Sequence, residues 1–208
     1  MLVNKGFLIA FEGIDGTGKS TQLQLLADFL TARGCEVMVT REPTDGVYGQ
    51  RIRKLYTDRS RCTPEEELEL FILDRKEHVK NVIIPQLNEG NVVITDRYYY
   101  STAAYQGVTE KDIQEIFKKN SFAPTPDLVV LLTMAPEVSI ARIQEGRGEN
   151  LNDFEQLDQL RFVAANFASF TESCIQRVSA SQEILQVQAE IRRIVMEAFI
   201  NKEYMCSE

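Results

Sequence analysis

The sequence is poor in the side chains that hold transition metals or act as nucleophiles. It contains one histidine, His78, and its four cysteines are too far apart to form a C-x-x-C pair; they are Cys35, Cys62, Cys174 and Cys206. Zinc sites and redox motifs depend on clustered cysteine and histidine, so neither these sites nor Cys/His or Ser/His catalysis is expected. We predict that His78 is an ordinary polar position on a helix.

Long hydrophobic runs and excess positive charge are also missing. The longest apolar runs, Phe7–Phe11 and Leu128–Leu132, are far shorter than the ~20 residues that cross a bilayer. The apolar stretch near the N-terminus is too brief for a secretory signal, so we expect a cytoplasmic protein with no membrane partner. Subtracting 31 acidic from 23 basic residues gives a net charge of -8, which argues against binding nucleic acid through bulk electrostatics. Any phosphate must be held locally.

The remaining composition is that of an ordinary folded protein. Its 208 residues are 44% hydrophobic and 26% charged, which is typical of globular rather than disordered or fibrous chains. We find no repeat, low-complexity stretch or linker. A chain of this length is expected to form one domain, residues 1–208.

Short apolar runs of strand length alternate with stretches of helical periodicity. The expected strands are Phe7–Phe11, Glu36–Thr40, Asn91–Thr95, Leu128–Thr133 and Glu183–Val187. Continuous apolarity indicates strands buried on both faces, as in a parallel sheet. The pattern predicts an α/β fold with about five parallel strands, helices on both faces and a ligand crevice at the carboxyl ends of the strands.

The helices are expected between these strands. A long amphipathic segment runs from Glu65 to about Leu87, and the residues from about Asn201 onward are expected to form a polar tail. Two further apolar stripes have helical spacing: Leu23, Leu26, Ala27 and Leu30, and Ile191, Ile194, Val195 and Ala198.

The residues from Gly13 to Ser20, Gly-Ile-Asp-Gly-Thr-Gly-Lys-Ser, match the P-loop pattern G-x-x-x-x-G-K-[ST] and stand between an expected strand and helix. The glycines allow the backbone to wrap phosphate oxygens, and Lys19 adds a mobile cation. Ser20 is expected to offer its hydroxyl to Mg²⁺. The residues expected at the phosphates are Gly13, Asp15, Gly16, Thr17, Gly18, Lys19, Ser20 and Thr21. A P-loop alone leaves kinases, GTPases and ATPase motors open.

Two further strand ends carry an arginine. Thr40-Arg41-Glu42-Pro43 and Thr95-Asp96-Arg97-Tyr98 follow expected strands, so both arginines are expected to point into the crevice. Together with Phe-Glu-Gly-Ile-Asp at the P-loop, these residues resemble the thymidylate kinase family. The resemblance extends through further segments: Leu70–Arg75, Ser101–Gly107, Pro126–Leu132, and Arg142 to Phe154-Glu155.

This resemblance implies an Mg²⁺-dependent, P-loop NTPase-type enzyme that transfers the γ-phosphoryl group of ATP to dTMP, giving dTDP and ADP for dTTP synthesis. It also implies a homodimer packed through helices, for which the apolar faces of residues 65–87 and 153–177 are available. The transferring phosphoryl group stays loosely bonded, so arginines, Mg²⁺ and backbone N–H groups are the needed tools and a covalent nucleophile is not.

The same resemblance assigns residues to the acceptor nucleotide. Arg97 would grip the acceptor phosphate with Arg41 as a second cation, and Asp96 would orient Mg²⁺ or hold a neighbouring arginine. The alternative for Arg97 is a structural ion pair with Asp96 or Glu42. The remaining residues of the expected dTMP site are Phe71 and Arg75 at the base, Asp15 at the sugar, Tyr105 near the sugar 2′-position, and also Glu42, Pro43, Ser101, Thr102 and Gln106. Taken alone, Phe71 is more often a core-packing residue and Arg75 more often a solvated one, and either Ser101 or Thr102 is also explained as a cap of the helix N-terminus.

A lid is expected at about residues 142–153, with Gly146 and Gly148 beside Arg147. The P-loop carries no arginine, so the resemblance implies that Arg147, or else Arg142, is the catalytic arginine; an ordinary charged loop is the alternative. Glu155 is a weaker candidate for the metal.

Two rival functions stay open at this level. One is a kinase for another pyrimidine monophosphate, and the other is a P-loop module that binds a nucleotide without transferring phosphate. The guanine-binding motif N-K-x-D does not occur in the sequence, which argues against a GTPase-like switch.

Overall fold

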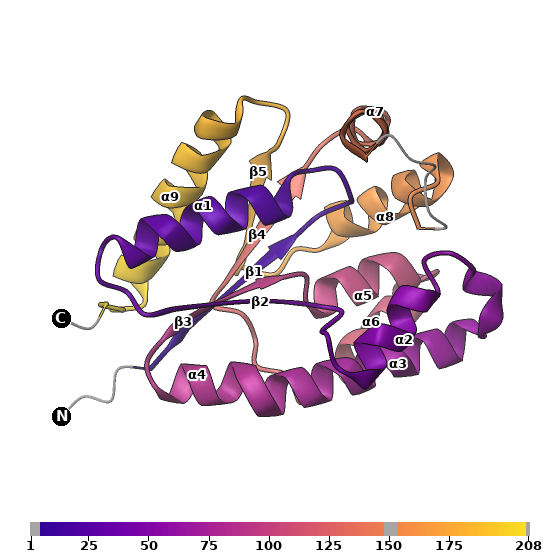
Figure 1. Cartoon of the computed structure of the whole chain (residues 1–208), viewed down its shortest axis with the longest axis horizontal. Helices are drawn as coiled ribbons and strands as arrows, with labels where there is room; N and C mark the ends of the chain where they lie inside the picture. The colour runs from indigo at the N-terminus through magenta and orange to yellow at the C-terminus, as the bar shows by residue number, and fades with distance from the viewer. Residues whose placement is uncertain (1–4, 148–153, 207–208) are drawn as a thin grey trace.

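In the computed structural model, which describes residues 5–147 and 154–206, five strands form one parallel sheet in the order β2-β3-β1-β4-β5 (Figure 1). The fold class predicted from the sequence is therefore confirmed. The strands are β1 (Phe7–Glu12), β2 (Val37–Arg41), β3 (Val92–Asp96), β4 (Leu128–Thr133) and β5 (Ile175–Ser179). The register pairs Phe11 and Arg41 with Asp96, so three strands end at the same edge of the sheet.

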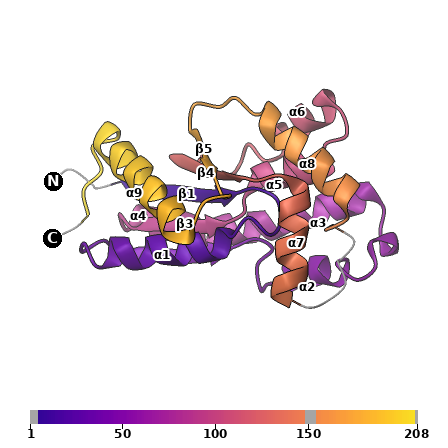
Figure 2. The ribbon, with the colours of Figure 1, turned by 90° about the horizontal axis from the view of Figure 1, so that it is seen from above.

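Helices cover both faces of the sheet (Figures 1 and 2). They are α1 (Lys19–Thr31), α2 (Val47–Lys54), the 3-10 helix η1 (Arg59–Arg61), α3 (Pro64–His78), the π-helical turn η2 (Val79–Ile83), α4 (Ile84–Asn88), α5 (Tyr99–Gln106), α6 (Glu110–Lys119), α7 (Pro136–Arg147), α8 (Leu157–Ser169) and α9 (Ile184–Asn201). Helices α1 and α9 pack on one face, while η2, α5, α6 and α8 pack on the other. Helix α7 follows β4 at the carboxyl end of the sheet.

Strand β1 shows why the apolar runs are continuous. Every residue of β1 is buried. Phe7, Ile9 and Phe11 join the core beneath α1 and α9, and Leu8 and Ala10 join the core on the opposite face. Because side chains alternate between the two faces of a strand, a central strand covered on both sides is apolar along its length, and in β1 only the last residue, Glu12, is polar.

The expected strand Glu183–Val187 is wrong. Glu183 caps the N-terminus of α9 through a capping box with Gln186, and the fifth strand is β5, which comes earlier in the chain. At the edge of the sheet, β5 leaves Gln176 and Arg177 exposed, so it has no continuous apolar run. A short run such as Ile-Leu-Gln-Val does not distinguish a strand from a helix start.

The long amphipathic segment predicted over residues 65–87 is one helical run. Thr63 and Glu66 form a capping box at the start of α3, with Pro64 in the first turn, and the run continues through η2 into α4. Helix α5 begins at Tyr99. No helix among the described residues is long and apolar enough to span a membrane.

The cysteine spacing gave no sign of a disulfide, yet the structure pairs Cys35 with Cys206 across a sequence separation of 171 residues. Cys35 lies just before β2 and Cys206 follows α9, so the bond ties the C-terminal segment to the loop between α1 and β2. Cys35 also packs in the core with Tyr204. Cys62 and Cys174 are free thiols.

Candidate active site

The P-loop passes from β1 to α1 through glycines with positive φ. A Cβ on Gly13, at φ +134°, would lie 2.4 Å from the carbonyl oxygen of Leu132, so no larger residue fits there. Gly18 caps α1 in the left-handed conformation with no side-chain cap, and a Cβ there would meet nothing within 4 Å. The first N–H groups of α1 therefore lack a side-chain acceptor at an open surface, which suits a phosphate.

The ammonium group of Lys19 lies against this loop. Nζ donates to the carbonyl oxygens of Gly13 at 3.0 Å and Ile14 at 2.9 Å. Burial, together with the positive charge of Arg97, lowers the pKa of Lys19 to about 8. The residue is 7% exposed, and a bound polyphosphate would add negative charge that favours the ammonium form.

The other residues predicted at the phosphates lie on the same loop and on the start of α1. The hydroxyl of Thr17 donates to the carbonyl oxygen of Ile14 at 2.9 Å, which braces the loop. Gly16 lies against Ser139 of α7, and Thr21 is exposed on α1.

Ser20 and Asp96 form the polar pair expected of a magnesium site. The Ser20 hydroxyl donates to Oδ2 of Asp96 at 2.6 Å, which joins the first turn of α1 to the end of β3. A hydroxyl and a carboxylate are hard oxygen ligands that suit Mg²⁺. Within residues 5–147 and 154–206, no cluster of three acidic, histidine or cysteine side chains is arranged to hold a metal without other ligands.

Arg97 is turned back over the P-loop by its own backbone. It has φ +71°, a left-handed conformation that is uncommon outside glycine and is often found at functional sites. Its N–H donates to the carbonyl oxygen of Phe11 at 2.9 Å. Its guanidinium donates to Oδ1 of Asp15 at 2.6 Å and to Oγ of Ser101 at 2.9 Å. The ion pair is therefore with Asp15, and neither Asp96 nor Glu42 takes that place.

Asp15 also accepts a hydrogen bond from the hydroxyl of Tyr105 at 3.0 Å. Burial alone would raise the pKa of Asp15, but the charges of Arg97 and Lys19 lower it to about 2. Asp15 is thus a permanent carboxylate that fixes both the guanidinium of Arg97 and the phenol of Tyr105.

Glu12, at the end of β1, anchors the first turn of α5. Its carboxylate accepts hydrogen bonds from the N–H of Tyr98 at 2.9 Å and from the hydroxyl of Ser101 at 2.5 Å. Burial raises the pKa of Glu12 to about 7. The sequence gave Glu12 no separate role, yet this contact sets where α5 begins relative to the P-loop.

A pocket with a volume of about 160 Å³, here called the acceptor pocket, is lined in part by Arg97. It brings together most of the residues predicted for the acceptor nucleotide. Its lining residues are Asp15, Pro43, Tyr56, Phe71, Arg97, Ser101, Thr102, Tyr105, Gln106, Phe154 and Glu155. Tyr56 and Phe154 had no assigned role; their rings lie 5.4 Å apart, and no local pattern marks Tyr56 as a site residue.

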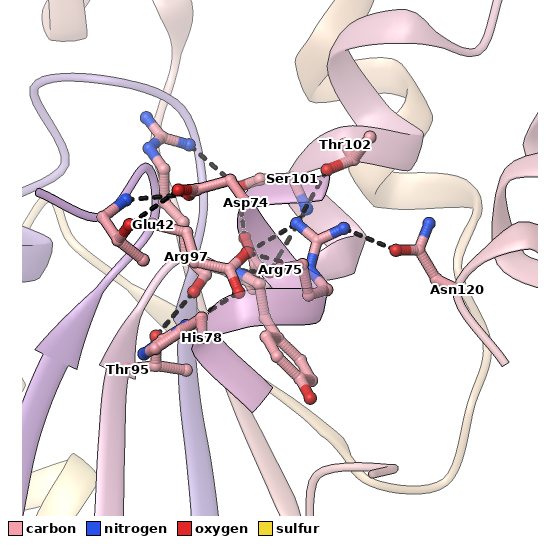
Figure 3. Close-up of polar contacts among 12 residues, drawn as sticks. Glu42, Asp74, Arg75, His78, Thr95, Arg97, Ser101, Thr102 and Asn120 are labelled. Atoms are coloured by element: carbon pink, nitrogen blue, oxygen red, sulfur yellow. Dashed lines mark hydrogen bonds and ion pairs between the residues drawn. The ribbon is translucent and has the colours of Figure 1, made fainter. Parts of the chain in front are cut away.

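Arg75 and Glu42 do not line this pocket. Figure 3 shows the polar contacts that they make with each other and with neighbouring residues. The guanidinium of Arg75 donates to Glu42 Oε2 at 2.8 and 2.5 Å. It also donates to Thr102 at 2.9 Å and to Asn120 at 2.6 Å. Both partners of the Arg75–Glu42 ion pair are almost fully buried, so Arg75 supports the pocket wall through Thr102.

His78 lies on helix α3, as predicted, and it belongs to the same buried network. Its ring nitrogens lie 3.0 Å from Oε1 of Glu42 and 2.7 Å from Oγ1 of Thr40. Because β2 ends beside α3, a polar residue on the inner face of that helix meets the carboxylate of Glu42 instead of water.

Arg41 is not brought to the acceptor pocket. It is exposed and pairs with Asp45 at 2.8 Å, and it lines a larger cleft of about 670 Å³ that also includes Ser20 and Asp96. Glu155 lines the acceptor pocket rather than this cleft, so the structure does not group it with the Ser20–Asp96 pair.

The predicted lid falls largely outside the described residues. Residues 148–153 and the side chain of Arg147 are not described, so nothing is assigned to Gly148 or to the guanidinium of Arg147. Arg142, on α7, donates to the carbonyl oxygen of Ala180 at 3.0 Å, between β5 and α9.

Comparison with known proteins gives one consistent result. A family model described as thymidylate kinase matches residues 11–191. A thymidylate kinase from Desulfotalea psychrophila is 50% identical over 188 residues, which cover 90% of this chain and 93% of that protein. A probable thymidylate kinase from Pyrococcus horikoshii is 41% identical, covering 92% and 96%. A thymidylate kinase from Xanthomonas euvesicatoria is 40% identical over 197 residues, which cover 95% of this chain and 86% of that protein.

Proposed function

We infer that this chain, which belongs to the thymidylate kinase family, transfers the γ-phosphoryl group of ATP to dTMP and produces dTDP and ADP. The observation that carries this conclusion is the joining of the P-loop to the acceptor pocket: Asp15, a P-loop residue that lines the pocket, forms an ion pair with Arg97, which also lines it. The two alternatives, a kinase for another pyrimidine and a non-catalytic module, are not favoured by the family relationship.

On the donor side, we propose that the P-loop N–H groups and Lys19 hold the phosphates of ATP. The open approach to Gly18 and the buried ammonium of Lys19 support this assignment. Ser20 and Asp96 would hold Mg²⁺, which typically keeps few protein ligands and completes its shell with water and substrate phosphates. When bound, the ion offsets negative charge on the phosphates.

On the acceptor side, we propose that Arg97 binds the phosphate of dTMP, because its guanidinium faces both the P-loop and the acceptor pocket. Phe71 offers a ring on which the base can stack. Tyr105, held by Asp15, would occupy the space of a ribose 2′-hydroxyl. Arg75 supports this site through Thr102, and a direct contact between Arg75 and the base stays a prediction.

In this arrangement the protein acts by positioning and charge. An oxygen of the dTMP phosphate attacks the γ-phosphorus, the bond from that phosphorus to the bridging oxygen of ADP breaks, and no covalent enzyme intermediate is needed. Lys19 neutralises charge on the donor phosphates, and Arg97 lowers the repulsion between the two nucleotides as they meet. Asp15 keeps Arg97 oriented through their 2.6 Å contact.

The substrate preference is tested by measuring ADP release with ATP and Mg²⁺ against several acceptors. We expect dTMP to be the best substrate, ahead of its ribose form, dUMP, dCMP and AMP, with about tenfold or greater loss of kcat/KM when a needed contact is missing. Turnover that prefers another pyrimidine monophosphate would overturn the assignment of the acceptor pocket. ATP binding without acceptor-dependent turnover would favour the non-catalytic module.

The pH dependence follows from Lys19. Its pKa in the folded protein is lowered to about 8, so the ammonium is charged below that pH and neutral above it. Phosphates of both nucleotides remain ionised in this range. We expect kcat/KM for ATP to fall as pH rises from 8 to 10, because this parameter reports the free enzyme. The decline in kcat at saturating ATP should be weaker, since bound phosphate favours the charged lysine. A flat kcat/KM profile would contradict the assignment.

Several features remain predictions from the sequence or from the family resemblance. These are the homodimer, the cytoplasmic location, the single domain over residues 1–208, and a lid at residues 142–153 that brings Arg147 or Arg142 to the donor phosphates. We propose no metal role for Glu155, because it lines the acceptor pocket and not the cleft that contains Ser20 and Asp96.

A further inference from the structure

Glu12 is a buried carboxylate to which the proposed mechanism gives no part. It ends β1 and is 0% exposed. Its Oε1 accepts hydrogen bonds from the N–H groups of Tyr98 at 2.9 Å and Ser101 at 3.2 Å, both in the first turn of α5. Tyr98, the N-cap residue of α5, provides no side-chain cap. A residue 86 positions earlier in the sequence therefore satisfies N–H groups that a local cap usually satisfies.

Ser101 joins this carboxylate to Arg97. The Ser101 hydroxyl donates to Oε2 of Glu12 at 2.5 Å, and its oxygen accepts from Nη1 of Arg97 at 2.9 Å (Figure 3). A hydroxyl carries one proton, and here Glu12 accepts it. The lone pairs of the Ser101 oxygen are then left for the guanidinium, which can only donate. The hydrogen bonds therefore run in one direction, from Arg97 through Ser101 to Glu12.

The two terminal nitrogens of the Arg97 guanidinium are held separately. Nη2 donates to Oδ1 of Asp15 at 2.6 Å, whereas Nη1 is held by Ser101. A guanidinium is planar, so contacts at both terminal nitrogens fix its plane and direct its remaining N–H groups. Because Arg97 lines the acceptor pocket, the plane of this group decides how a phosphate in the pocket is met.

We propose that Glu12 is a positioning residue for phosphoryl transfer, acting through Ser101 to hold the guanidinium of Arg97 toward the acceptor phosphate. This inference rests on the proposed function, in which Arg97 binds that phosphate. Asp15 fixes one side of the guanidinium, and the contact from Ser101 to Glu12 fixes the other. Loss of the second contact leaves the charge of Arg97 in place but frees its plane. A displacement of about 1 Å from the reacting geometry can cost about 100-fold in rate.

The test compares Glu12→Gln and Ser101→Ala with the wild-type chain in steady-state kinetics. Burial raises the pKa of Glu12 to about 7, so the assays are run at pH 8, where the carboxylate is mostly ionised. In Glu12→Gln the amide oxygen accepts from the two N–H groups, and the NH₂ group faces the Ser101 hydroxyl, which can no longer donate there. We expect kcat/KM for dTMP to fall about 10- to 100-fold in each variant. The KM for ATP should stay within about twofold.

Double variants show whether Glu12 acts on Arg97. Glu12→Gln combined with Ser101→Ala should lose no more activity than the larger single loss. In the Arg97→Met background, either change should cost less than about threefold more. Ser101 also lines the acceptor pocket, and a direct contact between Ser101 and dTMP would persist as a further loss in that background. Losses that multiply across the variants would overturn the proposal.

Thr109→Ala is the matched control for the loss of a helix cap. Thr109 is exposed and caps α6 through a capping box with Asp112. Its removal should lower the melting temperature by a few degrees and leave kcat/KM unchanged. Glu12→Asp keeps the carboxylate on a shorter side chain and should recover part of the activity. If Glu12→Gln lowered only the melting temperature, Glu12 would be a helix cap and not a positioning residue.

Two further measurements cover failure of folding and failure of the proposed function. If Glu12→Gln does not fold, as judged by circular dichroism, Ser101→Ala alone and with Arg97→Met decides. If the wild-type chain does not phosphorylate dTMP, the proposed function fails. The orientation of Arg97 is then tested by nitrogen-15 NMR of arginine-labelled protein, with the Nη signals assigned by their loss in Arg97→Met. Separate Nη signals in the wild type that average in Ser101→Ala would support a held guanidinium, and identical signals in both proteins would overturn it.

Discussion

Replacing Lys19 with methionine should lower kcat/KM for phosphoryl transfer to dTMP by about 10²- to 10⁵-fold, or ~3 to 7 kcal/mol in the barrier. Methionine keeps the length of the side chain but removes the cation that the P-loop places beside the donor phosphates. Among the described residues, the ammonium donates its hydrogen bonds to loop carbonyl oxygens, those of Gly13 and Ile14. The loss should therefore appear in steady-state kinetics with ATP as the varied substrate.

The same variant should remain folded, which separates catalysis from stability. The lowered pKa of Lys19 means that burial disfavours its charge, so a neutral side chain removes a desolvation cost even though it gives up two hydrogen bonds. We expect a melting temperature within a few degrees of the wild type. Lys111→Met is the matched control, since Lys111 is exposed on α6 and pairs with Glu115. Normal phosphorylation by Lys19→Met would exclude the proposed mechanism.

Replacing Arg97 with methionine should have an effect of similar size, about 10³-fold or more in kcat/KM for dTMP. Arg97 is the only arginine among those lining the acceptor pocket in the described residues. Its loss removes the cation proposed for the acceptor phosphate. It also removes the ion-pair partner of Asp15, which keeps its hydrogen bond from Tyr105. The KM for dTMP should rise as kcat falls, whereas the KM for ATP should change little.

Two comparisons make this result specific. Arg97→Lys keeps a positive charge but cannot form the same set of contacts with Asp15 and Ser101, so it should recover only part of the activity. Arg193→Met removes an exposed arginine that pairs with Glu197 on α9 and should behave as wild type. A small loss confined to the melting temperature of Arg97→Met would indicate that the Arg97–Asp15 pair is only structural.

Arg41 and Arg97 show how much of the site can be predicted from the sequence. Both arginines stand at or just after the end of a strand, and the pattern alone treats them alike. In the structure, Arg41 ends the edge strand β2 and turns to Asp45. Arg97 follows the internal strand β3 and is turned by its left-handed backbone toward Asp15. Position within the sheet, and not the local motif, separates them.

The hydrogen bonds that Arg59 and Gln106 donate to the buried carboxylate of Glu67 could not be predicted from the sequence, for a related reason. Gln106 was assigned to the acceptor site by resemblance, but nothing nearby in the sequence marks Arg59 or Glu67. Their contact joins η1, α3 and α5, and it depends on how these helices pack. The disulfide between Cys35 and Cys206 is another pairing that spacing could not indicate.

The sequence by itself determined the features that depend on neighbouring residues. The P-loop needs its glycines, Lys19 and Ser20 in a fixed local order, and buried strands such as β1 need continuous apolar residues. Tertiary structure alone decided which distant side chains meet: Glu42 with Arg75 and His78, and Arg97 with Asp15. Packing brings such residues together from separate elements, and a buried charge is stable only where that packing supplies its partner.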